Sequence, residues 1–155
     1  MPNLVRPTLL LAGATTLLAT RVLAAADSLV VVVANGPLAG TYSAPAGEII
    51  CLHEKPPNYP NSGYAVTWRR FQGYGAKVLA QAAMEVSNTE KPGAKHGDVL
   101  IDFGDPDHDP VQYHIFREPI SFKLSTAGFT MDFEGKTKEG IRLHVTASCV
   151  DVEES

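Results

Sequence analysis

Four aspartates and one histidine crowd into the eight residues from Asp102 to Asp109. Three of the aspartates, Asp105, Asp107 and Asp109, stand at every second position, a spacing that could direct carboxylate oxygens at one hard cation. The turn lacks the glycine and the glutamate that an EF-hand loop requires, so it is not that motif. Calcium binding by these three aspartates is one hypothesis, and a solvated turn without metal is the alternative.

A second chemically suggestive stretch lies between Tyr59 and Tyr74, where five of the twelve aromatic residues gather around Arg69 and Arg70. Aromatic rings beside hydrogen-bonding groups can stack on sugar rings or anchor a protein partner. The two rings on the predicted strand 64–69 share one face and are expected in the core. The loop tyrosines and the arginines, Tyr59, Tyr74, Arg69 and Arg70, are therefore the candidate ligand-binding residues, for a protein or carbohydrate partner.

No local motif of a hydrolase is present. The five histidines are scattered without an H-E-x-x-H sequence, and no serine lies in a G-x-S-x-G motif. Ser62 belongs to an Asn-Ser-Gly sequence that is typical of a turn. A hydrolase or metal-dependent enzyme would have to use the acidic turn Asp102–Asp109 with His108 or His114. Because triads are recognised by geometry and not by spacing, a site assembled from distant residues also stays open.

The elements that must position these groups are strands. The clearest pattern spans Phe129 to Cys149, where apolar and polar residues alternate on both sides of the loop Gly135–Gly140. Alternation with a period of two around a glycine-bounded loop is typical of a half-buried antiparallel hairpin. Cys149 falls on the apolar face of this hairpin, so its sulfur is expected to point into a core.

The only other cysteine, Cys51, lies in the run Glu48–His53, which is apolar on both faces, as in a central strand covered by two layers. Two cysteines in an exported chain are usually paired, and we predict a Cys51–Cys149 disulfide. Closing a loop of roughly 100 residues would stabilise the fold by about 4–5 kcal/mol in the chain-entropy model. A reactive thiol or a metal ligand beside His53 is the alternative.

Residues 1–26 have the pattern of a secretory signal peptide. Arg6 supplies positive charge, residues 9–20 form an uncharged apolar run, and three alanines precede Asp27 as a cleavage site. The alternative is an uncleaved membrane anchor, although the run is short for a span of about 20 residues. We therefore predict a secreted or periplasmic protein with no membrane span after cleavage.

Further strands are predicted, each bounded by turn residues, at 28–34, 64–69, 99–103, 111–115 and 120–124. Residues 77–87 fit both an alternating strand and an alanine-rich helix, and the strands on either side favour the strand. This spacing predicts an all-β fold, an antiparallel β-sandwich or barrel of about seven to nine strands with at most one short helix. Residues 27–150 would form this single domain, and 151–155 a frayed tail.

Charge and loops suggest a function class. Without residues 1–26 the chain has eleven basic and seventeen acidic residues, a net charge of −6, which argues against nucleic-acid binding. We predict an exported non-enzymatic module, binding or envelope-associated, that acts through the loops Lys55–Gly63, Gly73–Lys77 and Gly104–Pro110 at one end of the sandwich. A small exported hydrolase or metal-dependent enzyme is the alternative. We predict no cofactor, with calcium at the acidic turn as the one exception.

Overall fold

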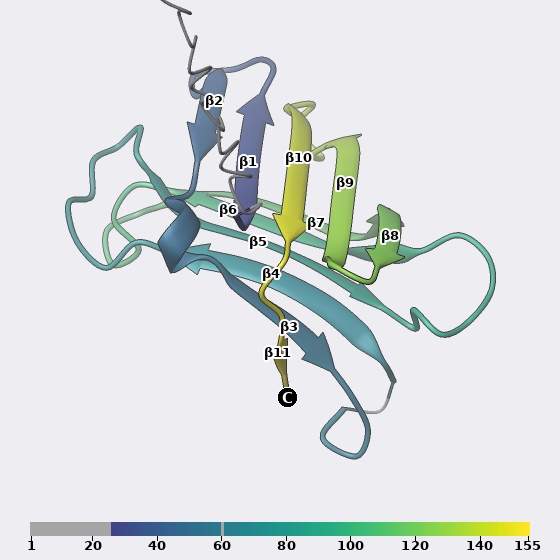
Figure 1. The fold of residues 1–155 in the computed structure, drawn as a ribbon. Coiled ribbons are helices and arrows are strands. Elements are labelled where there is room, and N and C mark those ends of the chain that lie inside the picture. The colour runs from purple at the N-terminus through teal and green to yellow at the C-terminus, as the bar shows by residue number, and fades with distance from the viewer. Residues whose placement is uncertain (1–25, 60) are drawn as a thin grey trace, which may run out of the picture.

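Two β-sheets stacked face to face make up the body of the protein (Figure 1). The computed structural model describes residues 26–59 and 61–155. The predicted signal peptide, residues 1–26, falls outside the described residues except for Ala26. Strands of the upper sheet cross those of the lower sheet steeply in Figure 1, as in orthogonal sheet packing.

Sheet A contains five strands in the order β2-β1-β10-β9-β8, all paired antiparallel. Their bounds are Ser28–Val33 for β1, Gly40–Ser43 for β2, Ser121–Ser125 for β8, Gly128–Lys136 for β9 and Arg142–Cys149 for β10. The register of β9 with β10 places Phe133 opposite Val145 and Met131 opposite Ala147. The hairpin predicted from the alternating pattern is thus the centre of this sheet.

Sheet B contains six strands in the order β11-β3-β4-β5-β6-β7. Their bounds are Ile50–Glu54 for β3, Gly63–Arg69 for β4, Leu79–Ser87 for β5, His96–Phe103 for β6, Val111–Pro119 for β7 and Glu153–Glu154 for β11. All pairs are antiparallel except β11 with β3, which are parallel. The short 3-10 turn η1, Ala46–Glu48, connects β2 of sheet A to β3 of sheet B.

The predicted all-β sandwich is confirmed, with eleven strands where we expected fewer. The ambiguous segment 77–87 contains β5, because pairing with β4 and β6 on both sides outweighs the helix propensity of its alanines. The two additional strands are the short β2 and β11. The tail 151–155, expected to be frayed, carries β11, because the Ser155 N–H donates to the His53 carbonyl at the edge of β3.

The core lies between the sheets and is built from the inward residues of the alternating strands. Val31, Val66, Met84 and Ile101 are completely buried. The predicted Cys51–Cys149 disulfide is confirmed: both cysteines are buried, with 6.0 Å between their Cα atoms, and the bond joins β3 of sheet B to β10 of sheet A. The expected position of β3 was wrong, because β3 lies near the edge of its sheet and only β11 lies outside it.

The connecting loops of sheet B leave it at alternate ends. Strands β3 to β7 are consecutive antiparallel neighbours, so each loop must lie at the end opposite to the one before it. The loops that contain Gly73–Lys77 and Gly104–Pro110 lie together, at the left of Figure 1, and the loop Lys55–Gly63 lies at the other end. Our expectation that all three share one end was therefore wrong for Lys55–Gly63.

Candidate functional site

A cavity of about 860 Å³ opens at the edge of the sandwich where β4 ends. We call it the arginine cleft and define it by Ile50, Trp68, Arg69, Arg70 and Phe71, which all line it. The first turn before β3, the segment after β4 and the acidic tail contribute the rest of its wall. The structure thus places both predicted arginines at one concave surface.

The floor of the arginine cleft is held rigidly. The indole of Trp68 is buried, and its N–H donates to a Glu48 carboxylate oxygen over 3.0 Å. The Arg70 guanidinium carbon lies 5.5 Å from the Trp68 ring centroid, and its Nε–H donates to the Leu79 carbonyl over 3.1 Å. A cation over an indole face is stabilised electrostatically, so Arg70 is fixed where it stands.

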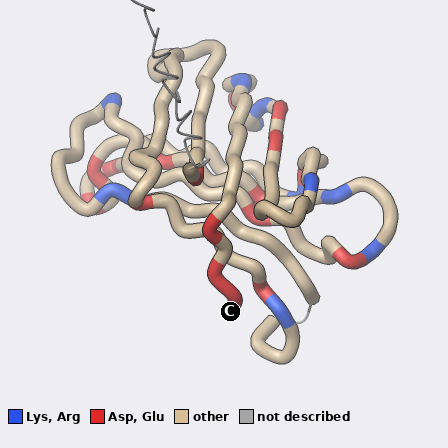
Figure 2. The backbone as a smooth tube through the Cα atoms, viewed as in Figure 1, with Lys and Arg blue, Asp and Glu red and all other residues tan. Residues whose placement is uncertain are grey.

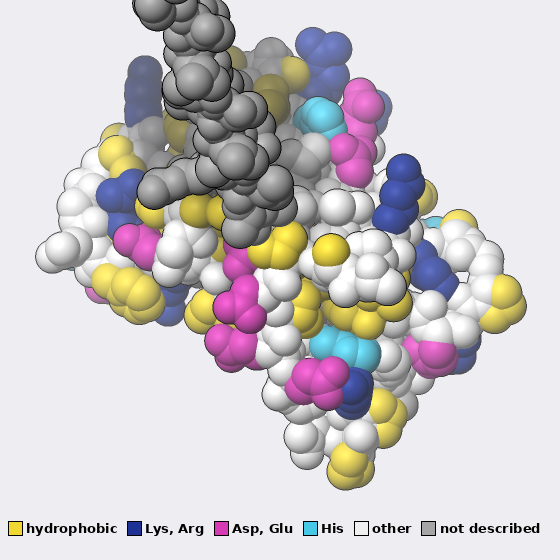
Figure 3. Space-filling model, in the orientation of Figure 1, with side chains coloured by type: hydrophobic (Ala, Val, Ile, Leu, Met, Phe, Trp, Pro, Cys, Tyr) yellow, Lys and Arg dark blue, Asp and Glu magenta, His cyan; other side chains and the backbone are white. Residues whose placement is uncertain are grey.

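The rim of the cleft is, by contrast, exposed. Phe71 is 85% exposed and Ile50 is 47% exposed. Within the described part of the chain, Arg69 has no carboxylate within 4.0 Å, and Asp151 and Glu153 line the same cavity. Hydrophobic side chains come to the surface around the β4–β5 loop in Figure 3, with charged side chains beside them. Apolar groups and an unpaired cation are therefore available to a partner.

A smaller cavity of about 220 Å³ brings Tyr74 together with the acidic turn, since Asp105, His108 and Asp109 line it too. The Tyr74 hydroxyl donates to the Arg70 carbonyl, which connects this hollow to the arginine cleft. Tyr59 lies in the loop after β3, at the opposite end of sheet B. Of the four predicted ligand-binding residues, three thus gather at one end and Tyr59 is separate from them.

The three aspartates predicted to bind calcium do not converge. Asp105 accepts hydrogen bonds from the Asp107 N–H over 3.0 Å and from His108 Nδ1 over 2.9 Å. These two bonds, the backbone one first, lower the pKa of the Asp105 carboxyl. The carboxylates of Asp105, Asp107 and Asp109 do not form a group of ligand atoms within 4.8 Å of one another in the described residues. Calcium binding stays a prediction, which thermal melts with and without the ion would test.

One group of potential ligand atoms does lie within 4.8 Å in the described residues, and it consists of Asp27, Cys51 and Cys149. The two sulfurs are bonded to each other, so neither is a thiolate that could bind a metal. The Asp27 carboxylate instead accepts from the Val150 N–H over 2.7 Å and from the Asp151 N–H over 3.2 Å. Asp27 therefore anchors the chain where it leaves the disulfide.

The histidines proposed for a hydrolase each have their own carboxylate. His114 Nε2 lies 3.1 Å from Asp102 Oδ1 across β6 and β7, and His108 is paired with Asp105. His144 on sheet A forms a third such pair with Asp132, over 3.0 Å. The His114–Asp102 and His144–Asp132 pairs are diagonal neighbours on adjacent strands, so the sequence reveals them only once strand order and register are known, whereas His108 and Asp105 lie three residues apart in one turn.

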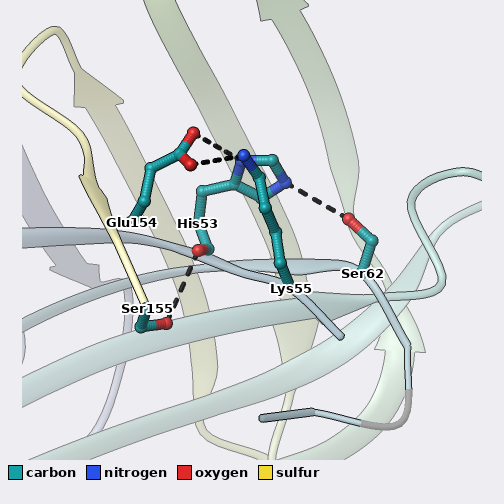
Figure 4. A network of polar contacts seen from close by, with 5 residues as sticks. All are labelled: His53, Lys55, Ser62, Glu154 and Ser155. Atoms are coloured by element: carbon teal, nitrogen blue, oxygen red, sulfur yellow. Dashed lines mark hydrogen bonds and ion pairs between the residues drawn. The ribbon is translucent and has the colours of Figure 1, made fainter. Parts of the chain in front are cut away.

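Sequence reasoning missed a network at the edge of β3, shown in Figure 4. His53 Nε2 lies 3.2 Å from Ser62 Oγ, and His53 Nδ1 lies 3.6 Å from a Glu154 oxygen. The His53 ring is also stacked on Tyr64, with centroids 4.2 Å apart. Serine, histidine and a carboxylate in this order have the composition of a hydrolase triad.

The surroundings of Glu154 indicate a different role. Its carboxylate is paired with the Lys55 ammonium, and the Ser155 main chain exchanges hydrogen bonds with His53 and Lys55 of the β3 edge. Figure 2 shows the acidic tail, in red, beside the end of β3, where Lys55 follows Glu54. The described cavities above are lined by other residues. We therefore interpret the network as the attachment of the tail to sheet B.

Comparison of the chain with family models, with curated proteins and with solved structures gives no match. Within the described residues there is no helix of the length and apolarity needed to cross a membrane. The function of the chain must therefore be inferred from the geometry of the arginine cleft and from the side chains on its rim.

Proposed function

We propose that this chain is an exported binding module whose arginine cleft holds a protein partner. The observation that carries the proposal is the exposed Phe71 ring beside the unpaired Arg69, at the mouth of a cleft. Aromatic and arginine side chains dominate the energetics of protein interfaces. The aliphatic Ile50 on the same rim favours an apolar side chain of a protein over the polar surface of a sugar.

The rigidity of the cleft floor supports the same proposal. Binding costs less when the groups that form the site are already ordered, because fewer rotamers are lost. The bond from Trp68 to Glu48 and the stacking of Arg70 on Trp68 order the floor without a ligand. Only Arg69 and Phe71 on the rim would have to adjust to a partner.

Export is the second part of the proposal. A buried disulfide is the expected product of an oxidising compartment, and the apolar run before Asp27 has the composition of a signal peptide. Intact mass spectrometry of the protein recovered from the exporting cell tests this part. We expect a chain that begins at Asp27 with both cysteines oxidised, and an intact Met1 or free thiols would contradict it.

Photo-crosslinking in the exporting cell tests the cleft itself. Phe71 is replaced by the photoreactive residue p-benzoylphenylalanine, and Leu124, an exposed residue of β8 on sheet A, is replaced in a matched control. We expect a discrete adduct from position 71 that disappears when Arg69→Glu is added, and none from position 124. Equal labelling from both positions, or an adduct that persists with Arg69→Glu, would show that the arginine cleft does not hold the partner.

A further inference from the structure

The middle of the outward face of sheet B is apolar, bordered by polar residues such as Gln81 and His114, and no element of the described chain packs on it. Cross-strand register places Thr67 of β4 beside Ala83 of β5, and Ala83 beside Leu100 of β6. Two residues away along β4, and on the same face, Leu52 of β3 stands beside Ala65. We call these five residues the apolar row. They alternate with buried residues such as Val66 and Met84, so they point away from the core.

The shape of this face is suited to docking. The two central strands carry small side chains, those of Ala65, Thr67 and Ala83, between the larger Leu52 on one side and Leu100 on the other. All five side chains are only half-buried. A polypeptide segment could therefore lie across the middle strands and cover apolar area that the fold itself leaves in water.

One end of the apolar row is acidic. Glu85 and Asp98 are cross-strand neighbours on the same face, and Glu54 lies on it at the end of β3. Burial raises the pKa of the Glu85 carboxyl, and the Glu54 and Asp98 carboxylates raise it further. Within the described residues, none of these three carboxylates has a cation within 4.0 Å. In the described structure these three carboxylates therefore lack an ion-pair partner.

The cations of the neighbouring β5–β6 hairpin are turned to other partners. The Lys91 ammonium donates to the Asn88 side chain over 2.7 Å, and the Lys95 ammonium donates to the Lys91 carbonyl. Asp98 accepts a hydrogen bond from the Arg117 main-chain N–H, over 2.8 Å. Lys91, Lys95 and Arg117 line the same hollow as Glu85 and Asp98 but form no ion pair with them in the described residues, so a cation supplied from outside the chain can pair with these carboxylates.

We propose that the outer face of sheet B docks a basic amphipathic segment of a partner protein. Its apolar side chains cover the apolar row, and its Lys or Arg side chains meet Glu54, Glu85 and Asp98. The proposal goes beyond the arginine cleft, because it concerns the face of the sheet and a partner of defined charge. Thr67 of the apolar row also lines the arginine cleft, and Ile50 stands opposite it on β3, so the two surfaces meet at these residues.

Fluorescence anisotropy with a labelled amphipathic peptide of leucine and lysine tests the proposal, with the same peptide carrying glutamate for lysine as its counterpart. We expect the lysine peptide to bind the full chain and the glutamate peptide not to bind. Ala83→Lys should weaken the lysine peptide by about tenfold or more, since it adds both bulk and like charge at the centre of the row. If Ala83→Lys does not fold, Ala65→Lys replaces it in the same binding measurement, with the same expected result.

Thr130→Lys is the matched control, because it makes the same charge change on an exposed outward position of sheet A. It should leave the affinity within about twofold. Equal weakening by both lysine variants would mean general charge attraction, and binding of the glutamate peptide would exclude the charge argument; either overturns the proposal. Arg69→Glu should not reduce binding, which separates this result from the fate of the arginine cleft.

A second copy of this chain is the competing occupant, and sedimentation velocity tests it directly. We expect the protein to sediment as a monomer at micromolar concentration, with or without Ala83→Lys. A dimer that Ala83→Lys dissociates and Thr130→Lys does not would assign the face to self-association and overturn the proposal.

Discussion

The two sheets of the sandwich differ most on the sides that face away from the core. Outward residues of β9 and β10 in sheet A are polar, as in the pairs Thr130 with Ser148 and Asp132 with Thr146, whereas β1 at their side carries Val30 and Val32 outward. Outward residues of sheet B include Leu52 and Leu100, with small residues between them. Both sheets bury a complete inner face, so the stability of the sandwich does not require the outer apolarity of sheet B.

This difference suggests a second interpretation of a strand whose sequence is apolar on both faces. The run that contains β3 looks like a central strand covered by two layers, yet Ile50 on its outer side is 47% exposed. In a single sandwich only one face of each sheet can be covered by the other sheet. Apolarity on the remaining face is therefore expected where a second molecule supplies the missing layer.

The largest predicted effect concerns the bond that joins the two sheets. Replacing both cysteines, Cys51→Ala with Cys149→Ala, removes a link over a separation of 98 residues. In the chain-entropy model this should lower the free energy of unfolding by about 4 kcal/mol, as measured by urea denaturation. Amide hydrogen exchange should accelerate in both sheets together. Faster exchange in only one sheet would contradict a single cooperative core shared by two sheets.

The next effect compares the two sides of β5 within sheet B. Met84 is completely buried, so Met84→Ala should cost about 3 kcal/mol through lost contacts and a cavity. Ala83→Ser on the outer side should change the free energy of unfolding by less than about 0.5 kcal/mol. Urea denaturation of both variants measures the difference. A large loss for Ala83→Ser would mean that the outer face is already covered within the chain.

The inner faces were predictable because alternation is a local property of the sequence. The alternating pattern predicted the correct facing of residues 129–134 and 142–149, although Gly135 and Lys136, predicted in the loop, belong to β9. The position of Cys149 on the apolar face predicted the disulfide. Strand β11 was missed because a two-residue strand contains no period to detect. The predicted position of the loop Lys55–Gly63 was wrong for a different reason. Successive loops of an antiparallel meander lie at opposite ends of the sheet, and this follows only once the strand order is known.

The candidate site was predictable only in part. Arg69, Arg70 and Tyr74 lie close in the sequence, and the turn after β4 keeps them together in space. The contacts of His53 with Ser62 and with Glu154 join three separate segments, and neither propensity nor spacing encodes them. Such contacts follow from strand order, which a single sequence does not determine.

A smaller effect concerns the tail that protects the edge of sheet B. Lys55, by hydrogen bond and charge, and then His53 lower the pKa of Glu154 below its ordinary value of 4.5. A lowered folded-state pKa means that the stabilisation is present above pH 4.5 and is lost as the pH falls through the folded pKa. The protection factor of the Lys55 amide, which is its exchange rate relative to the intrinsic rate at the same pH, should therefore fall on acidification, because this N–H donates to the Ser155 carbonyl. Glu154→Gln should remove this dependence, and an unchanged pH profile would mean that the attachment does not depend on Glu154.

The smallest effect tests the acidic end of the apolar row without any partner. The pKa of Glu85 is raised, first by burial and then by Glu54 and Asp98, so ionisation of Glu85 opposes folding at neutral pH. The penalty is present above the folded pKa and disappears as the pH falls through it, which is opposite in sign to Glu154. Glu85→Gln should raise the free energy of unfolding by no more than about 0.5 kcal/mol, because solvent and salt screen a partly exposed group.

Thermal melts at two pH values and two salt concentrations measure this effect, with Glu134→Gln on the outer side of sheet A as the matched control. We expect Glu85→Gln to raise Tm at neutral pH and low salt, and the gain to shrink in acid and in high salt. Glu134→Gln should show no such gain, because Glu134 is an exposed side chain that stands opposite His144 and not opposite another carboxylate. A stabilisation by Glu85→Gln that persists in acid would point to packing instead of charge, and the outer face of sheet B would then lose its electrostatic preference for a basic partner.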